Sequence, residues 1–174
     1  MIFSEIYHMK TCHKFVLAVT LLFLADRAFA QTADTAKLNF IKARFAEISQ
    51  NLKSYKKVEK TDTAETTDGN SVLLYYEGNE IRKITAAYYG ESGKALHEFY
   101  FSGKKLIFCY FVIYYYNKPY YIKGGGKVAS TADKRIYLDN DKIFFIKKRP
   151  AVSKNSDEFP DDPQKEAKRL INLK

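Results

Sequence analysis

The chain has no tryptophan, and it has only two cysteines, three histidines and four prolines among 174 residues. Cys12 falls in a leader that we expect to be removed, so Cys109 is left alone, which excludes an intramolecular disulfide framework. His97 is the single histidine beyond residue 30. This excludes a histidine-rich zinc site and an HExxH metalloprotease motif, and no metal site is expected.

The chain also lacks an apolar run long enough to form a membrane-spanning helix. Residues 15–25 form an uncharged apolar run of eleven residues, which is the length of a signal-peptide core and too short to span a bilayer. Lys10 and Lys14 precede the run, and an Ala-Phe-Ala sequence at 28–30 supplies the small residues that signal peptidase requires. We therefore expect cleavage before Gln31 and export to the periplasm or the medium. The alternative is an uncleaved anchor helix.

Acidic residues are outnumbered, with 20 Asp and Glu against 29 Lys and Arg, a net charge of +9. The first 30 residues hold three cations and two carboxylates, so residues 31–174 keep a charge of +8. This charge favours anionic partners such as acidic glycans, phospholipid headgroups or nucleic acid, although no nucleic-acid motif is present. The alternative is that dispersed lysines only keep an aromatic-rich protein soluble.

The segment 34–59 has the pattern of an amphipathic helix. Thr32, Asp34 or Thr35 can cap its start. Its apolar residues recur every three or four positions and form one stripe of Leu38, Ile41, Phe45, Ile48, Leu52 and Tyr55. The stripe covers fewer than three heptads, so packing on the protein's own sheet is favoured over a coiled coil.

Beyond the polar loop 60–70 the apolar period changes from that of a helix to that of a strand. Three units follow, each with two aromatic-rich runs around a tight polar turn: 71–89 turning at 77–80, 97–116 turning at 102–105, and 134–147 turning at 139–142. The turns contain Gly78, Gly103, Asn140 and Asp141, which tolerate the positive φ that short hairpins require. Six antiparallel strands in a meander are predicted.

The run 106–116 is apolar on both faces, which is typical of a central strand covered on both sides, or of one covered on a single side. One face has Ile107, Cys109, Phe111, Ile113 and Tyr115, and the other has Leu106, Phe108, Tyr110, Val112, Tyr114 and Tyr116. We expect the helix stripe to meet the first face. The tyrosine-rich face should be less completely buried because each hydroxyl needs a partner or water.

Two further segments complete the expected fold. Three glycines at 124–126 predict a flexible crossing that ends near Asp133. A short basic helix is expected through Ile171, with Asp161 or Asp162 as its cap and Pro163 in its first turn. The fold class is therefore α+β: a signal peptide at 1–30 and one mature domain at 31–174, with a helix at 34–59, a six-stranded antiparallel β-meander at 71–147 and a tail with a short helix at 151–174.

The repeated hairpins resemble those of MORN-like and antitoxin-type proteins, and those of exported bacterial proteins built from similar hairpins. The similarity lies in LYYEGNEI at 74–81, FYFSGKKL at 99–106 and YLDNDKI at 137–143. The resemblance implies a β-meander used for binding or scaffolding, and it transfers no site residues.

No pattern in the chain indicates a catalytic site or a cofactor. The Gly-Gly-Gly-Lys sequence at 124–127 lacks the first glycine and the Ser or Thr of a phosphate-binding loop. The carboxylate pairs at 77/80 and 139/141 flank hairpin turns, which select acidic residues for backbone reasons. The alternative is a small envelope hydrolase with a minimal carboxylate and histidine site, for which the candidates are Glu77, Glu80, His97 and Glu98.

The tyrosines are the remaining candidates for function. Tyrosine rings stack on sugars or bases, and nearby lysines can hold an acidic group. We therefore expect a binding surface formed by Tyr110, Tyr114, Tyr116, Lys118, Tyr120 and Lys123. The alternative is that tyrosine is used here only because it is a strong strand former.

The predicted function is that of an exported, non-enzymatic binding or scaffold module of the bacterial cell envelope. Its partner would be an envelope protein or an anionic polymer, since the chain combines export, positive charge and an aromatic sheet. A structural subunit or antitoxin-like partner, whose sheet edge or tyrosine face pairs with another chain, is a further possibility.

Overall fold

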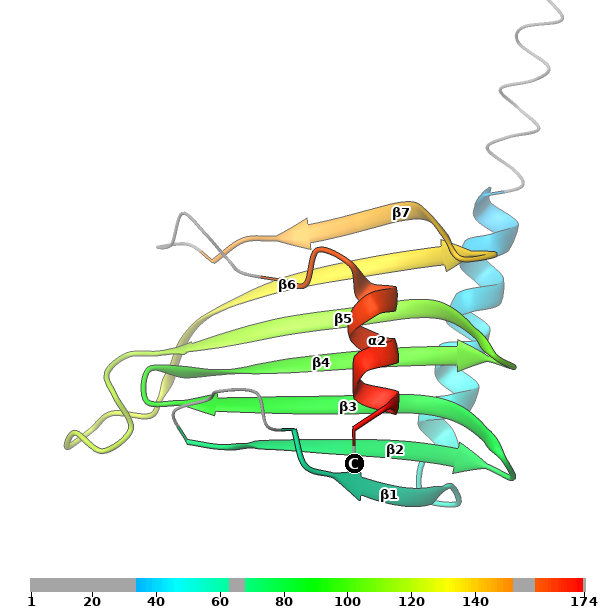
Figure 1. Cartoon of the computed structure of the whole chain (residues 1–174). Coiled ribbons are helices and arrows are strands. Elements are labelled where there is room, and N and C mark those ends of the chain that lie inside the picture. The colour runs from blue at the N-terminus through cyan, green and yellow to red at the C-terminus, as the bar shows by residue number, and fades with distance from the viewer. Residues whose placement is uncertain (1–33, 63–67, 152–158, 174) are drawn as a thin grey trace, which may run out of the picture. The chain divides into compact units, whose positions relative to one another are not determined.

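The computed structural model describes residues 34–62, 68–151 and 159–173 (Figure 1). The expected signal peptide at 1–30 lies outside the described residues. The chain divides into two units, Met1–Phe40 and Ile41–Lys174. The described part of the first unit, residues 34–40, begins a helix that continues to residue 50 in the second unit. All packing discussed below lies within the second unit.

The second unit is built on one antiparallel sheet whose strands follow one another in chain order (Figure 1). Each strand pairs with the preceding and following strands, so the expected meander is confirmed. The sheet has seven strands: β1 (Lys56–Lys60), β2 (Asn70–Glu77), β3 (Glu80–Gly90), β4 (Gly93–Ser102), β5 (Lys105–Tyr116), β6 (Val128–Asp139) and β7 (Lys142–Arg149).

The three expected hairpin turns occur where the sequence places them. Gly78 and Gly103 have φ values of +60° and +59° in the first two turns. Asn140 and Asp141 have φ values of 48° and 63° in the third. Glycine adopts this region without steric cost, and Asn and Asp tolerate it better than other residues. The turn residues therefore define where the strands on either side end.

The N-terminal helix covers residues 34–50 and is shorter than the expected 34–59. It is followed by a turn in which the Ser54 N–H donates to the Asn51 carbonyl over 2.9 Å. Residues Lys56–Lys60 then pair with β2 as the additional strand β1. Val58 is the single apolar residue of β1, so its sequence shows no strand period, and pairing with β2 decides its conformation.

From Phe108 onward, the helix packs on the opposite face of β5 from the one expected. At the start of β5 the register shift between Tyr100 and Phe101 interrupts the alternation, so Ile107 lies on the helix side with Phe108, and Leu106 lies on the other side. The buried helix residues Ile41 and Ile48 lie in one cluster with Phe108, and the other members are Tyr55, Tyr75, Tyr100 and Ile107. Cys109 and Phe111 belong to the cluster on the other face. Alternation shows which residues share a face. Because both faces of β5 are apolar, the pattern could not show which of them the helix covers.

The expected short C-terminal helix, α2 (Pro163–Ile171), covers the other face of the sheet (Figure 1). Asp162 is its cap, and the carboxylate accepts hydrogen bonds from the N–H groups of Gln164 and Lys165 over 3.0 and 2.9 Å. Ala167 and Leu170 are buried against the sheet residues Val72, Leu74, Ile84, Ala86, Phe99, Phe101, Leu106, Cys109, Phe111, Ile136 and Leu138. Within the described ranges, no helix has the length and apolar character needed to cross a membrane.

The connection from β5 to β6 differs from the expected flexible crossing. The Asn117 N–H donates to the Lys127 carbonyl over 2.8 Å and closes residues 117–127 into a compact turn. β6 begins at Val128, before the expected position near Asp133, because the ladder with β5 continues to the pair Tyr116 and Val128. The three glycines therefore belong to a turn of fixed shape.

Candidate binding site between the N-terminal helix and the sheet

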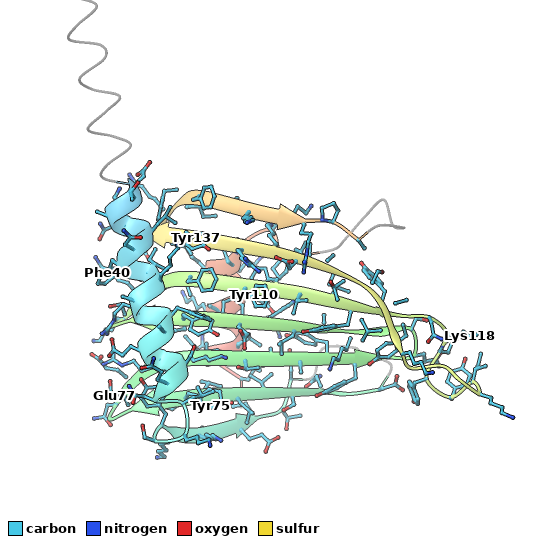
Figure 2. The ribbon with its side chains drawn as sticks, turned by 180° about the vertical axis from the view of Figure 1, so that it is seen from behind. Phe40, Tyr75, Glu77, Tyr110, Lys118 and Tyr137 are labelled. Carbon is cyan, nitrogen blue, oxygen red and sulfur yellow. The ribbon has the colours of Figure 1, made fainter. Side chains whose placement is uncertain are left out.

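A cavity of about 360 Å³ lies between residues 41–45 of the N-terminal helix and strands β5 and β6. This volume is within the range of small-molecule sites. Its lining consists of Ile41, Lys42, Phe45, Phe108, Tyr110, Arg135 and Tyr137. Figure 2 shows Tyr110 and Tyr137 on the strands that the helix crosses.

Aromatic rings form the apolar wall of this cavity. The ring centroids of Phe45 and Phe108 are 5.7 Å apart in an edge-on arrangement, and those of Phe108 and Tyr137 are 4.9 Å apart. These separations are typical of favourable ring pairs. Phe45 remains 38% exposed although it belongs to the apolar stripe of the helix. Ring contacts therefore hold the wall in place, while the Phe45 side chain of the helix remains partly exposed to solvent.

Two cations stand beside this apolar wall. The Arg135 guanidinium lies over the Tyr110 ring, 5.3 Å from its centroid, and its Nε is 3.5 Å from the Asp133 carboxylate. Lys42 is exposed on the helix, and it forms no ion pair with any described residue. No acidic side chain is among the described residues that line the cavity. The site can therefore hold an apolar or aromatic body and a negatively charged group at the same time.

The Asp133 carboxylate balances only part of the positive charge around Arg135. Asp133 is buried and is shared with a second cation, because the Nε of Arg149 lies 2.6 Å from its other carboxylate oxygen. The shared carboxylate orients Arg135 towards Tyr110 and leaves the pair of arginines with a net positive charge. A bound anion would complete the charge balance of this group.

On the same face of the sheet, the side chains of Lys83, Glu98 and Tyr100 are joined by an ion pair and a hydrogen bond. Lys83 Nζ lies 2.5 Å from a Glu98 carboxylate oxygen, and the Tyr100 hydroxyl donates to the other carboxylate oxygen over 2.8 Å. Burial, and next the Glu98 charge, raise the pKa of the Tyr100 hydroxyl well above its usual value. Glu98 is thus bound by two partners and serves to fix Tyr100, which packs against Phe45 at a centroid distance of 4.9 Å.

The six residues predicted to bind do not form one site. Tyr110 lines the cavity. Tyr114 and Tyr116 lie further along β5, and six residues of strand span roughly 20 Å. Tyr114 is half-buried with the Lys94 ammonium 5.0 Å from its ring centroid. Lys118, Tyr120 and Lys123 are exposed in the 117–127 turn, at the other end of the sheet from the helix (Figure 2).

Sequence reasoning missed most of the cavity lining. Lys42 and Phe45 were assigned only to the helix, and Arg135 and Tyr137 only to the third hairpin. The sequence did contain one indication, because Arg135 and Tyr137 are two residues apart in a predicted strand and therefore share one face of it. Their position beside Tyr110 depends on the register of β5 with β6, where Tyr110 pairs with Arg135. That register spans an eleven-residue connection (117–127), so no short turn reveals it.

The four candidates for a hydrolytic site are not brought together. Glu77 and Glu80 both bind Arg82, at 2.8 and 2.9 Å. His97 and Glu98 are consecutive strand residues, so their side chains lie on opposite faces of the sheet. His97 is held between the rings of Tyr88 and Phe111, at centroid distances of 5.1 and 4.9 Å.

The side chain of His97 instead faces a polar cluster that joins α2 to the sheet. Arg169 forms ion pairs with Asp62 at 2.8 Å and with Glu166 at 2.9 Å. Its guanidinium also donates to the Tyr88 hydroxyl over 3.0 Å, and His97 Nδ1 lies 3.9 Å from Glu166. The hydrogen bond from Arg169 is the main reason why the pKa of Glu166 is lowered to about 2. Each charge here has a partner, as expected for a cluster that fixes α2.

Neither the Cys109 thiol nor a cluster of metal-ligating side chains provides reactive chemistry among the described residues. Burial raises the pKa of the Cys109 thiol, so the thiol stays protonated and packs as an apolar side chain. Among the described residues, no three His, Cys, Asp or Glu side chains are grouped as a metal site would require.

Comparison of the chain with protein-family models, with curated proteins and with solved structures finds no match. The geometry of the site therefore provides the functional argument.

Proposed function

We propose that the protein is an exported, non-enzymatic binding module of a bacterial cell envelope, and that its ligand is a small anionic amphiphile. The observation that carries this proposal is the cavity in which Lys42 and Arg135 stand beside the rings of Phe45, Phe108 and Tyr137. This ligand class differs from the protein or polymer partner expected from the sequence, because the cavity has the size of a small molecule.

The arrangement favours binding over catalysis. The described lining offers ring faces, two tyrosine hydroxyls and two cations, and it includes no carboxylate, thiol or imidazole. Such a set can orient an apolar body and neutralise an acidic group. It contains no nucleophile held by a general base in the way that hydrolases require.

The arrangement of the rings and the two cations suggests how such a ligand would lie in the cavity. A ring or short acyl chain would lie on the wall of Phe45 and Phe108, and its carboxylate, sulfonate or phosphate would lie between Lys42 and Arg135. Arg135 is held over the Tyr110 ring, so its donors are positioned before the ligand arrives. Positioned donors lose less entropy on binding than free ones do.

The test uses anilinonaphthalene sulfonate, which combines an aromatic body with one negative charge and becomes fluorescent in apolar sites. We expect saturable binding to the purified protein. The double variant Lys42→Gln/Arg135→Gln should bind at least about tenfold more weakly, since two charge-assisted contacts are lost. The matched control is Lys53→Gln/Lys127→Gln, which removes two exposed lysines elsewhere and should bind as the parent does.

Equal affinity of the cavity variant and the control would contradict the proposal, provided that circular dichroism shows both to be folded. Competition with dodecanoate and with an aromatic carboxylate would then distinguish an acyl ligand from an aromatic one. Dodecanol, which lacks the charge, should compete poorly.

Export is a separate part of the proposal and rests on the sequence of residues 1–30. It predicts that protein recovered from the periplasm or medium of a bacterial expression host begins at Gln31. Mass spectrometry of the recovered chain checks this directly, and a full-length chain retained in the cytoplasm would contradict export without affecting the binding test.

A further inference from the structure

The turn at 117–127 has a fixed shape that its three consecutive glycines make possible. Gly124 and Gly126 have φ values of +76° and +75°, a region that other residues rarely adopt. A side chain on Gly125 would place its Cβ 1.9 Å from the Pro119 carbonyl oxygen. All three glycines are therefore required by the geometry of the turn, which we call the tip.

Hydrogen bonds hold the tip from within. The Gly125 N–H donates to the Ile122 carbonyl over 2.7 Å, and the Gly126 N–H donates to the Lys118 carbonyl over 3.1 Å. The Asn117 side chain bridges the two sides, donating to the Gly124 carbonyl over 3.0 Å and accepting from the Lys127 N–H over 3.1 Å. The tip is thus preorganised before it meets any partner.

This fixed tip presents apolar surface to water. Tyr120, Tyr121 and Ile122 are 51%, 62% and 44% exposed. The Tyr120 hydroxyl donates to Asp68 over 3.1 Å and the Tyr121 hydroxyl to Glu91 over 3.4 Å. The polar atoms are therefore directed to the base of the tip, and the ring faces and the Ile122 side chain remain outside. An exposed apolar group on a rigid support is typical of an interaction site.

Cations surround this apolar group. Lys118, Lys123 and Lys127 are all exposed on the tip, and the carboxylates of Asp68 and Glu91 accept the hydrogen bonds of the tyrosine hydroxyls. Tyrosine rings and aliphatic side chains between lysines match the boundary between lipid headgroups and acyl chains. Each lysine near an anionic leaflet adds to the electrostatic attraction.

We propose that the tip docks the protein on an anionic phospholipid surface, with Tyr121 and Ile122 entering the headgroup layer and the lysines binding lipid phosphates. This goes beyond the proposed function, because it assigns a second surface with a different partner. In Figure 2 the tip, marked by Lys118, and the cavity, marked by Tyr110 and Tyr137, lie at different ends of the sheet. Docking through the tip would leave the cavity accessible.

The experiment is co-sedimentation of the purified protein with phosphatidylcholine vesicles that contain none or about 30 mol% phosphatidylglycerol. We expect binding to the anionic vesicles only, and a fall of at least fivefold at about 0.5 M salt, where charges are screened within a few ångströms. Absence of binding to anionic vesicles overturns the proposal and would indicate that the tip meets a protein. Equal binding to neutral vesicles also overturns it.

Variants locate the contact. Tyr121→Ser/Ile122→Ser should reduce the bound fraction on anionic vesicles at least fivefold, and Lys118→Gln/Lys123→Gln should reduce it about as much. The matched control is Ile143→Ser/Phe145→Ser, since these residues of β7 are 44% and 43% exposed. Vesicle binding that survives both tip variants, or that the control abolishes equally, overturns the proposal. Thermal unfolding verifies that each variant is folded. If Tyr121→Ser/Ile122→Ser does not fold, Lys118→Gln/Lys123→Gln still tests the contribution of the tip.

Discussion

The two faces of the sheet differ in how completely they are covered. On the α2 face, Phe99 and Phe111 are fully buried together with Leu170 of the helix. On the other face, Phe45 of the N-terminal helix is 38% exposed and borders a cavity of about 360 Å³. Burial is therefore more complete on the α2 face, and the other face leaves the cavity in which we propose that the ligand binds.

The charges of the two faces follow the same division. On the α2 face, Arg169 is bound by both Asp62 and Glu166, so this set has one carboxylate in excess and no unmatched cation. On the cavity face, Arg135 shares the Asp133 carboxylate with Arg149, and the positive charge is in excess. Ion pairs with no unmatched cation fix a helix, whereas an excess of positive charge attracts an anionic ligand.

The largest difference should appear when one ring is removed from each face. Phe99→Ala opens a cavity in a fully buried cluster and should lower the free energy of unfolding by about 3–5 kcal/mol. Phe45→Ala removes a ring that is already partly in water and should cost about 1 kcal/mol. Denaturant unfolding measures both, and similar losses for the two variants would contradict the division.

Arginine substitutions extend the comparison to charge. Arg169→Gln leaves the buried Asp62 and the neighbouring Glu166 without their cation and should cost about 2–3 kcal/mol. Arg82→Gln is the matched control, since Arg82 also binds two carboxylates, but those of Glu77 and Glu80 are 54% and 44% exposed, whereas that of Asp62 is buried. For Arg82→Gln the cost should be about 1 kcal/mol or less. If the control costs as much in the unfolding experiment, the α2 cluster has no special role.

The pKa of Glu166 makes the α2 face sensitive to acid. Its folded value of about 2 lies below the ordinary value of 4.5, so the stabilisation is fully present above about pH 4.5 and is lost as the pH falls towards 2. Solvent screening at this partly exposed cluster limits the loss to roughly 1–2 kcal/mol. The unfolding free energy of Glu166→Gln, compared with that of the parent chain, should lack this part of the pH dependence. An identical pH profile would show that Glu166 does not anchor α2.

The smallest effect on stability is expected for Lys42→Gln, because Lys42 is exposed and has no carboxylate partner among the described residues. The free energy of unfolding should change by less than about 0.5 kcal/mol. The affinity for anilinonaphthalene sulfonate should fall about fivefold, as one charge-assisted contact is lost. A loss of stability without a loss of affinity would assign Lys42 to the fold and not to the site.

Local patterns in the sequence predicted much of this fold. The hairpin turns were found because positive φ restricts them to residues such as Gly103 and Asn140. The cap of α2 was narrowed to Asp161 or Asp162 because both precede Pro163, and the structure shows that it is Asp162. β1 was missed because it has one apolar residue, Val58, and exists only through pairing with β2.

The candidate site was harder to predict because it depends on long-range register. Tyr110 was predicted to bind because of its residue type, and it lines the cavity. Arg135 was not, although the two residues pair across β5 and β6. Local periodicity shows that each residue faces one side of its strand. It does not show which strands lie next to each other across a long connection, or which face a helix covers.

Amide NMR of the protein during titration with anilinonaphthalene sulfonate tests the division between the two faces most directly. The account predicts that saturable shift changes concentrate at residues 41–45, 108–110 and 135–137, and that amides of α2 and of Asp62, Tyr88 and His97 do not move. Changes centred on α2 and its ion cluster, with residues 41–45 unaffected, would contradict it.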